Sequence, residues 1–389
     1  METPHETPRE FRTPPPRIRG DPVEAVDLFE SVPNFSEGKD RAVIDSIASA
    51  AEAAHVLDVD PDPDHHRAVV SLLARRERLI DALLRAVAAA AERIDLRKHA
   101  GVHPRVGAAD VVPIVPIGAT TIDACREVAH EVGRRIWTDL HIPVFFYGYG
   151  EEWTLADIRA GRAQPDLGGP DLHPAAGAVC VGARPPLVAF NVLLPDTTVA
   201  EARRVARSLR ESAGGLRGVQ ALVFELPGGR IQLSMNLFRV DESPPDSVIE
   251  ELRHRGVHLG DQQVVGLCPA VAANDAASGR ILEARVGAAV AREGGRGAGQ
   301  AGGDELAALG QRLAKEAESL AALGSSQEEL LAGAERCAAL PPVLQAAGQL
   351  DGELQSMAHL AARGLRDALS EATRLRYRAR MAALDRRLG

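Results

Sequence analysis

The densest group of side chains that could do chemistry lies in one short stretch, residues 95–110. Within it, His99 and His103 are four positions apart, the spacing at which two imidazoles share one face of a helix. A helical metal site would use that spacing, but Gly101 and Pro104 interrupt a helix here, and neither an HExxH glutamate nor a third ligand is in view. We therefore expect this stretch to need no metal.

Proton transfer is a better use for one of these histidines. An imidazole titrates near pH ~6.5, so it can accept and return a proton close to neutrality. Lys98 and Arg105 would lie beside it as cationic partners. The alternative is a loop whose histidines only form hydrogen bonds with the backbone, and the residues alone leave both interpretations open.

A second polar stretch, residues 58–67 (DVDPDPDHHR), joins two predicted strands. Asp60 ends the first strand and Arg67 begins the next, so both side chains could face one cleft. An aspartate beside a histidine can fix its tautomer and stabilise the imidazolium. Arg67 could bind a carboxylate through two hydrogen bonds. A solvated acidic turn is the alternative, and it suits Asp62 and Asp64 better than Asp60.

Two further segments have the composition of ligand-binding loops. Residues 32–38 (VPNFSEG) precede a predicted helix, so Asn34, Ser36 and the helix N-terminus could receive an anion, or either side chain could only cap the helix. Residues 168–177 (GGPDLHPAAG) would let the backbone approach a flat ligand at a domain junction, although a plain linker has the same composition.

The composition limits which proteins could carry these groups. The chain has 389 residues, 45% of them hydrophobic and 25% charged, which is typical of a globular protein with two or three domains. A net charge of −9 argues against nucleic-acid binding. No run approaches the ~20 apolar residues of a membrane span, and the first 22 residues lack the apolar core of a signal peptide. Four scattered cysteines form no CxxC pair. We therefore expect a cytoplasmic location and no membrane partner.

The hydrophobic pattern predicts the elements that must position these segments. Strands alternate with helices in residues 26–147, and a similar alternation recurs in residues 187–255, including a hairpin around Pro227. No GxGxxG motif follows the first strand, so a dinucleotide-binding domain is not favoured. The pattern predicts an α+β protein with two tandem α/β sandwiches.

The C-terminal part differs in character. A glycine-rich stretch, residues 291–303, predicts a linker. A stripe of apolar residues at helical spacing follows, and it includes Leu354, Met357, Ala361 and Leu365. We predict a disordered arm (1–25), two subdomains (26–183 and 184–290), the linker, and a helical tail (304–389) that is a small bundle or an oligomerising arm.

Taken together, these segments resemble the formiminotransferase family, the glutamate formimidoyltransferases of histidine breakdown. The resemblance covers about residues 26–275, in order. It is carried by VPNFSEG (32–38), LDVD (57–60), RKHAGVHPRVGAADVVPIVP (97–116), HPAAGAVCVGARPPLVAFNVLL (173–194), SMNLFRV (234–240) and VVGLCP (264–269).

The resemblance implies two ferredoxin-like halves and the transfer of a formimino group from N-formimino-L-glutamate to N5 of tetrahydrofolate. It makes His103 the catalytic base and Asp60 its partner in proton transfer. The carboxylates of the substrates suit Arg67, Arg105 and Arg184, with Asn34 and Ser36 nearby. The folate-binding segment of the family falls on Gly168, Gly169, Pro170, Asp171, Leu172, His173, Pro174, Ala175, Ala176 and Gly177.

The resemblance also implies small-molecule substrates, a homodimer and no metal. Some relatives carry a helical cyclodeaminase, but the glycine-rich opening of that domain is missing after Gly303 and the tail is about half the required size, so we expect no cyclodeaminase activity. Two alternatives remain open: the same fold acting on a formyl donor such as 5-formyltetrahydrofolate, and a non-catalytic folate-binding scaffold.

Overall fold

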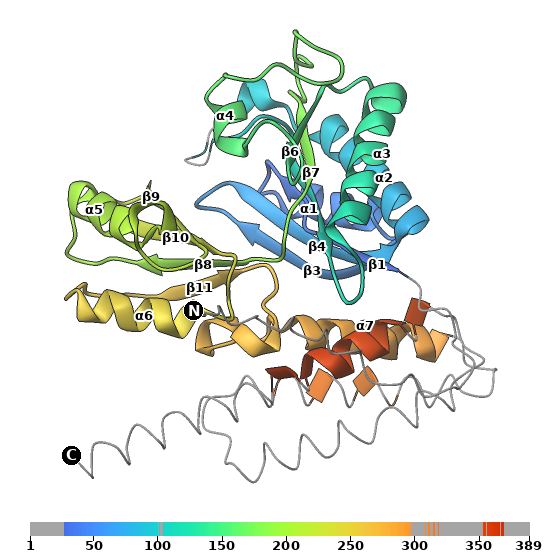
Figure 1. Ribbon diagram of the computed structural model, residues 1–389. Helices are drawn as coiled ribbons and strands as arrows, with labels where there is room; N and C mark the ends of the chain where they lie inside the picture. Colours follow the sequence, from blue (N-terminus) through green and yellow to red (C-terminus); the bar gives the residue numbers. More distant parts are fainter. Residues whose placement is uncertain are drawn as a thin grey trace, which may run out of the picture.

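The computed structural model of the protein describes residues 27–99, 101, 104–296, 308, 310–311, 314–315, 318, 353–354, 356–365 and 367–368. In this part of the chain two β-sheets lie side by side, and each is covered by helices (Figure 1). We call residues 28–183 the first half and residues 188–265 the second half.

The first half forms the larger sheet. Its order begins β3-β4-β1/β2-β5 with antiparallel neighbours, and β7 and β6 extend it beyond β5 through parallel pairs. The strands are β1 (Leu28–Ser31), β2 (Asn34–Phe35), β3 (His55–Asp62), β4 (Arg67–Arg75), β5 (Ala109–Pro116), β6 (Val144–Gly148) and β7 (Val179–Ala183). The helices are α1 (Arg41–Ala50), α2 (Arg76–Arg93), α3 (Ile122–Leu140) and α4 (Leu155–Arg159).

The second half forms the smaller sheet, with the order β11-β8-β10-β9 and antiparallel pairs throughout. Its elements are β8 (Val188–Leu193), α5 (Val199–Leu209), β9 (Val219–Leu226), β10 (Arg230–Leu237), α6 (Pro245–His254) and β11 (Gln262–Val265). This β-α-β-β-α-β chain order is ferredoxin-like. Strands β1 to β5 of the first half have the same connections and the same spatial order, so the predicted fold class is confirmed.

Local sequence explains where several elements begin and turn. Thr198 caps α5 and Glu201 bonds back to it, forming a capping box, and Thr121 caps α3 in a simpler way. The β9–β10 hairpin turns through Gly228 and Gly229, whose φ angles of 80° and 73° favour glycine. The hairpin agrees with the one predicted around Pro227.

Two main hydrophobic cores hold the elements together. One lies between α1, α2, α3 and the first sheet. The other joins α5, α6 and the second sheet to α7 (Leu282–Arg296) and to a helical segment within residues 353–368. Short 3₁₀ turns occupy Leu96–Lys98, Glu211–Ala213, Ala270–Ala272 and Asp275–Ala277.

The structure departs from the predicted elements in several places. Strands β7 and β11 were not predicted, since β7 has a glycine and β11 begins with two glutamines, and only pairing with neighbours makes them strands. Helix α7 continues to Arg296, so the predicted linker start at residue 291 was wrong. Packing of Ala289 and Val290 into the core carries that helix into the glycine-rich stretch.

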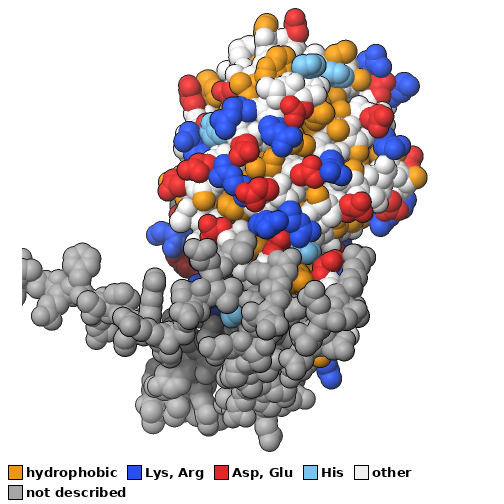
Figure 2. Space-filling view, turned by 90° about the vertical axis from the view of Figure 1, so that its right-hand side faces the viewer, with side chains coloured by type: hydrophobic (Ala, Val, Ile, Leu, Met, Phe, Trp, Pro, Cys, Tyr) orange, Lys and Arg blue, Asp and Glu red, His pale blue; other side chains and the backbone are white. Residues whose placement is uncertain are grey.

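Figure 2 shows Lys and Arg side chains interspersed with Asp and Glu over one face of the described residues. Among these residues no helix is long and apolar enough to cross a membrane. The predicted N-terminal arm (1–25) and most of the predicted tail lie outside the described residues.

Candidate functional site

The hairpin that joins β3 to β4 lies at the centre of the site. In its turn, His65 donates its backbone N–H to Asp62 Oδ1 (2.9 Å), and His65 Nδ1 lies 2.8 Å from Asp62 Oδ2. Although burial opposes it, these hydrogen bonds hold the pKa of Asp62 below its usual value. The His65 ring contacts Phe224 of β9 edge-on, with centroids 5.2 Å apart. The turn is therefore ordered by its own aspartate and by the second half.

Alternation along the hairpin sorts its side chains onto two faces. Asp60 pairs with Val69 and Asp62 with Arg67, while Val70 and Leu72 point into the core beneath α1, α2 and α3. Asp60 and Arg67 therefore share the face opposite these helices, as the spacing in the sequence predicted.

Residues 32–38 pack against this turn. Ser36 Oγ donates to the Gly107 carbonyl (2.7 Å), and the Gly38 N–H donates to His66 Nδ1 (3.1 Å). A Cβ atom on Gly38 would lie 2.2 Å from the Asp62 carbonyl, so only glycine allows this approach. The suggestion that Asn34 or Ser36 caps the following helix is wrong, because Asp40 caps α1 and accepts from two of its N–H groups.

Asn34 and Ser36 are both buried, and their hydrogen bonds run to the protein backbone. Asn34 Nδ2 donates to the Val32 carbonyl (2.8 Å), whereas its buried Oδ1 accepts no hydrogen bond from the described residues. Ser36 thus joins residues 32–38 to residue 107, and Asn34 keeps one oxygen for a ligand or water.

The imidazoles of His66 and His99 and the guanidinium of Arg105 lie together at this turn. The rings of His66 and His99 lie 4.0 Å apart, and Arg105 Nη1 is 2.6 Å from each ring nitrogen of His99. Burial and the Arg105 charge lower the pKa of His99 to about 4. Burial also lowers the pKa of His66, although Glu37 opposes the shift. Both rings are therefore neutral near pH 7, when they can accept hydrogen bonds.

Several arginines surround one buried carboxylate beside these rings. Asp110 Oδ1 accepts from the Val106 N–H (2.6 Å), and Asp110 Oδ2 accepts from Arg159 of α4 (2.7 Å). Burial lowers the pKa of Arg67 to about 10 despite the attraction of Asp110, and burial also lowers that of Arg105. Since the guanidinium groups outnumber the carboxylates around Asp110, this cluster suits an anionic ligand.

Asp60 lies on the same face, but its two oxygens contact Gly266 and Arg280, which follow the second half in the chain. Its side chain is 5% exposed, Oδ1 lies 2.7 Å from Arg280 Nη2, and Oδ2 accepts from the Gly266 N–H (3.0 Å). Asp58 contacts the same arginine at 3.3 Å. The predicted partner in proton transfer is thus oriented by residues that follow the second half in the chain.

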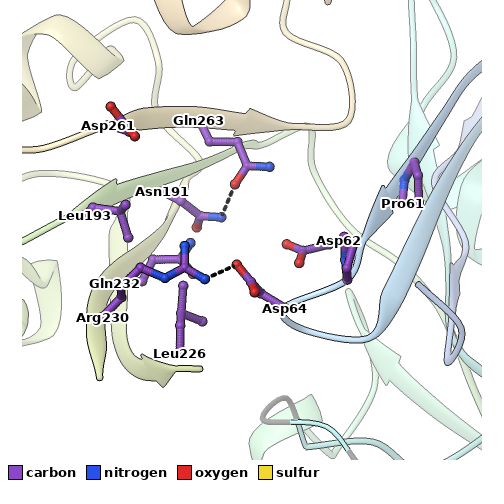
Figure 3. Close-up of a pocket in the computed structure, with 11 residues that line it drawn as sticks. Pro61, Asp62, Asp64, Asn191, Leu193, Leu226, Arg230, Gln232, Asp261 and Gln263 are labelled. Atoms are coloured by element: carbon purple, nitrogen blue, oxygen red, sulfur yellow. Dashed lines mark hydrogen bonds and ion pairs between the residues drawn. The ribbon is translucent and has the colours of Figure 1, made fainter. Parts of the chain in front are cut away.

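A cavity of about 280 Å³ lies between the hairpin turn and the open face of the second sheet (Figure 3). Arg230 crosses it to Asp64 (2.6 Å), and Asn191 Nδ2 donates to Gln263 Oε1 (3.4 Å). Gln232 is 5% exposed, and its Oε1 accepts no hydrogen bond from the described residues. The lining residues are Pro61, Asp62, Pro63, Asp64, Asn191, Leu193, Leu226, Arg230, Gln232, Asp261 and Gln263. The cavity therefore offers amide and carboxylate groups to a polar ligand.

The predicted folate-binding segment is divided by the fold. Its end, His173–Gly177, pairs with residues 106–108. The Ala108 N–H donates to the Ala176 carbonyl (2.8 Å), and a Cβ on Gly177 would lie 2.2 Å from the Val106 carbonyl. Its start packs elsewhere: a Cβ on Gly168 would lie 2.4 Å from the Trp137 ring.

The structure does not bring Arg184 to the arginine cluster. Arg184 follows β7, donates to the Pro185 carbonyl (3.0 Å), and lies near Tyr147 and Glu30 at the other end of the sheet. Burial lowers the pKa of Arg184 and raises that of Glu30. His103 lies outside the described residues, so its predicted role stays a prediction.

Sequence reasoning missed two contributors to the site. Arg159 lies in a short helix with no recognisable motif, and the amides of β8, β10 and β11 alternate with apolar residues as in any half-exposed strand. Within the described residues no three His, Cys, Asp or Glu side chains are arranged to hold a metal ion.

The fold and site define an α+β protein with two ferredoxin-like halves and a site lined by arginines and histidines. The sequence profile of the formiminotransferase domain, N-terminal subdomain, matches residues 28–184. The chain is 36% identical over 274 residues to the glutamate formimidoyltransferase of Streptococcus pyogenes serotype M1, covering 64% of this chain and 92% of that protein.

Two further relatives give the same result. The glutamate formimidoyltransferase of Thermoplasma acidophilum is 36% identical over 279 residues, covering 65% of this chain and 91% of that protein. The formimidoyltransferase-cyclodeaminase of Rattus norvegicus is 36% identical over 281 residues, covering 64% of this chain and 52% of that protein. The chain belongs to the formiminotransferase family, a family of transferases, and the resemblance seen in the sequence is confirmed.

Proposed function

We propose that the protein is a glutamate formimidoyltransferase, which moves the formimino group of N-formimino-L-glutamate to N5 of tetrahydrofolate and releases L-glutamate. The observation that carries this proposal is the 36% identity over 92% of the Streptococcus pyogenes glutamate formimidoyltransferase. The convergence of residues 32–38, the β3–β4 turn, His99 and residues 104–110 at one site supports it.

The charges of the site suit the two substrates. Formiminoglutamate brings two carboxylates, which the guanidinium groups of Arg67 and Arg105 would bind. Tetrahydrofolate would lie along His173–Gly177, with the polar edge of its heterocycle facing the amides of the cavity. We assign Arg184 no direct substrate contact, because it lies near Glu30 and Tyr147.

The chemistry needs a proton carrier between two nitrogens. N5 of the pterin forms a bond to the formimino carbon and loses its proton, while the bond from that carbon to the glutamate nitrogen breaks and this nitrogen gains a proton. One imidazole can serve both steps, which accounts for about 10²–10⁴ in rate. We assign this role to His103, with Asp60 as its partner, and most of the remaining acceleration to holding both substrates in one site.

A direct assay tests the proposal. Purified protein with both substrates should form 5-formiminotetrahydrofolate, followed by absorbance, with release of one glutamate for each product. A formylated glutamate donor should react at least ~100-fold more slowly. Faster turnover of the formyl donor would favour a formyltransferase instead, and binding of folate without any turnover would favour a scaffold.

We also propose a cytoplasmic homodimer. The three described cysteines, Cys125, Cys180 and Cys268, are buried free thiols, which is compatible with a reducing compartment. Light scattering of the purified protein would give the subunit number.

A further inference from the structure

The helical segment within residues 353–368 runs beside α7 along the underside of the molecule (Figure 1). Met357, Ala358, Ala361 and Leu365 are 0% exposed and lie in the same core as Ala289 and Val290 of α7 and the second sheet. Their spacing places them on one face of the helix. The segment therefore buries its apolar face inside this chain.

Close packing against α7 depends on one glycine. A Cβ atom on Gly364 would lie 2.3 Å from Glu283 Oε1 and 2.8 Å from its Cγ. Glu283 has little room to move, because it is 6% exposed and its Oε2 accepts from the Ala270 N–H (2.8 Å). Gly364 is thus a point of close approach between the two helices.

The other end of the segment contacts the first half. Glu353 is 2% exposed, its Oε2 lies 2.9 Å from Arg78 Nη1, and its Oε1 accepts from the Arg75 N–H (3.2 Å). His55 Nε2 is 3.5 Å from the same carboxylate. Although burial opposes it, these partners hold the pKa of Glu353 below its usual value. Each of these partners belongs to β3, β4 or α2.

The middle of the helix also lies near the first half. Leu360 faces the loop between β5 and α3, where a Cβ built on Gly118 would lie 3.5 Å from its Cδ1. The core that contains Met357 and Leu365 also includes Leu28 and Leu73 of the first sheet. The segment thus touches both halves with different kinds of contact.

We propose that residues 353–368 form an intramolecular clasp that holds the two halves in one fixed arrangement. The apolar face and Gly364 attach it to α7 and the second half, and Glu353 locks it to the first half. The clasp is separate from the arginine cluster and from the cavity, so it acts on stability and on the alignment of the halves.

The sign of the change in melting temperature of Gly364→Ala separates a docked helix from one that is free in solution. Alanine strengthens any helix that is free in solution, because it costs less backbone entropy than glycine. In a docked helix the added Cβ collides with Glu283. We expect the full-length variant to have a melting temperature lower by about 2 °C or more. A higher melting temperature would overturn the clasp.

Glu353→Gln tests the other end without a change of volume, with Arg363→Gln as the matched control. Arg363 is exposed on the same helix and pairs only weakly, at 4.0 Å, with Asp367. We expect Glu353→Gln to lower the melting temperature by about 3–8 °C and the control by less than about 1 °C. Equal shifts would contradict the proposal.

The concentration dependence of melting distinguishes a clasp within one chain from an arm exchanged between two copies. Because the melting temperature of any homodimer rises with protein concentration, the comparison is between the wild type and Glu353→Gln, and we expect both to show the same rise over a ~100-fold range. A smaller rise in Glu353→Gln, together with a loss of dimer mass in that variant, would assign the helix to a partner subunit and overturn the proposal.

Discussion

Burial and one arginine set the protonation of the imidazoles at the site. Gly38 donates its N–H to His66 Nδ1, which requires that nitrogen to be unprotonated, and Arg105 approaches both nitrogens of His99. His66 therefore accepts through Nδ1, and the neutral His99 ring can accept from Arg105 through one of its nitrogens, so neither ring carries a second proton near pH 7.

The titration of His99 provides a prediction. Its pKa in the folded protein is about 4, against ~6.5 in an unfolded chain. Between these values the unfolded state binds a proton that the folded state does not, so the free energy of unfolding should fall as the pH falls from ~6.5 to about 4. Urea unfolding across this pH range should show a smaller fall in the free energy of unfolding for His99→Gln than for the wild type. A His99 imidazole that titrates at ~6.5 in the folded protein, measured by NMR, would contradict this prediction.

The proton-transfer role of His103 predicts a large kinetic effect. His103→Ala should lower kcat by about 10²–10⁴ and leave the melting temperature nearly unchanged. His258→Ala is the control, because His258 is an exposed residue of the second half whose side chain contacts only Asp196 in the described residues. A His103→Ala enzyme that keeps more than about a tenth of the wild-type rate would remove His103 from the mechanism.

At the scale of elements, the β3–β4 hairpin contributes most to the site, because its turn contacts residues 32–38, His99 and Arg105, and the second half. Two ion pairs connect it to more C-terminal parts of the chain. Arg280 binds Asp60 in a nearly buried setting, whereas Arg230 and Asp64 are 46% and 38% exposed. These pairs differ mainly in burial, so their contributions to the free energy of unfolding should differ.

The comparison of the two pairs is a stability prediction. Arg280→Gln should lower the free energy of unfolding by about 2–4 kcal/mol, since it leaves the carboxylate of Asp60 buried without its charged partner. Arg230→Gln should cost no more than about 1 kcal/mol, because water screens an exposed pair. Denaturant unfolding of both variants measures the difference. Equal losses would mean that burial of Asp60 does not govern the contact.

For the whole molecule, the cavity lies between the halves, so a ligand that fills it should stabilise both. A stable folate such as 5-formyltetrahydrofolate, present at ~100 times its Kd, should add about 2.7 kcal/mol to the free energy of unfolding. Thermal unfolding with and without the ligand would measure this.

Gln232→Ala should reduce the affinity for that folate about tenfold, because it removes a buried amide that faces the cavity. Leu222→Ala is the control, since Leu222 is 57% exposed on the neighbouring strand and does not line the cavity. An unchanged affinity in Gln232→Ala would show that the heterocycle binds outside the cavity.

Most of the fold could be predicted from the sequence, because long amphipathic helices and apolar strands have strong periodicity. The alternation predicted for residues 26–147 appears as β1 to β6, with α1, α2 and α3 between them. β7 and β11 could not be predicted in the same way, because their short segments become strands only by pairing with β5, β6 and β8. The four polar segments were recognised from composition, but their mutual contacts were not.

The sequence by itself determined the α+β class, the family, and the residue types available for proton transfer and for binding carboxylates, since these depend on local periodicity and on motif identity. Only the tertiary structure decided that Asp60 is held by Arg280, that Arg184 lies away from the arginine cluster, and that Arg159 joins it. The reason is physical: distance and burial, which set charge interactions, depend on strand register and on how the halves pack, and neither is encoded in any single segment.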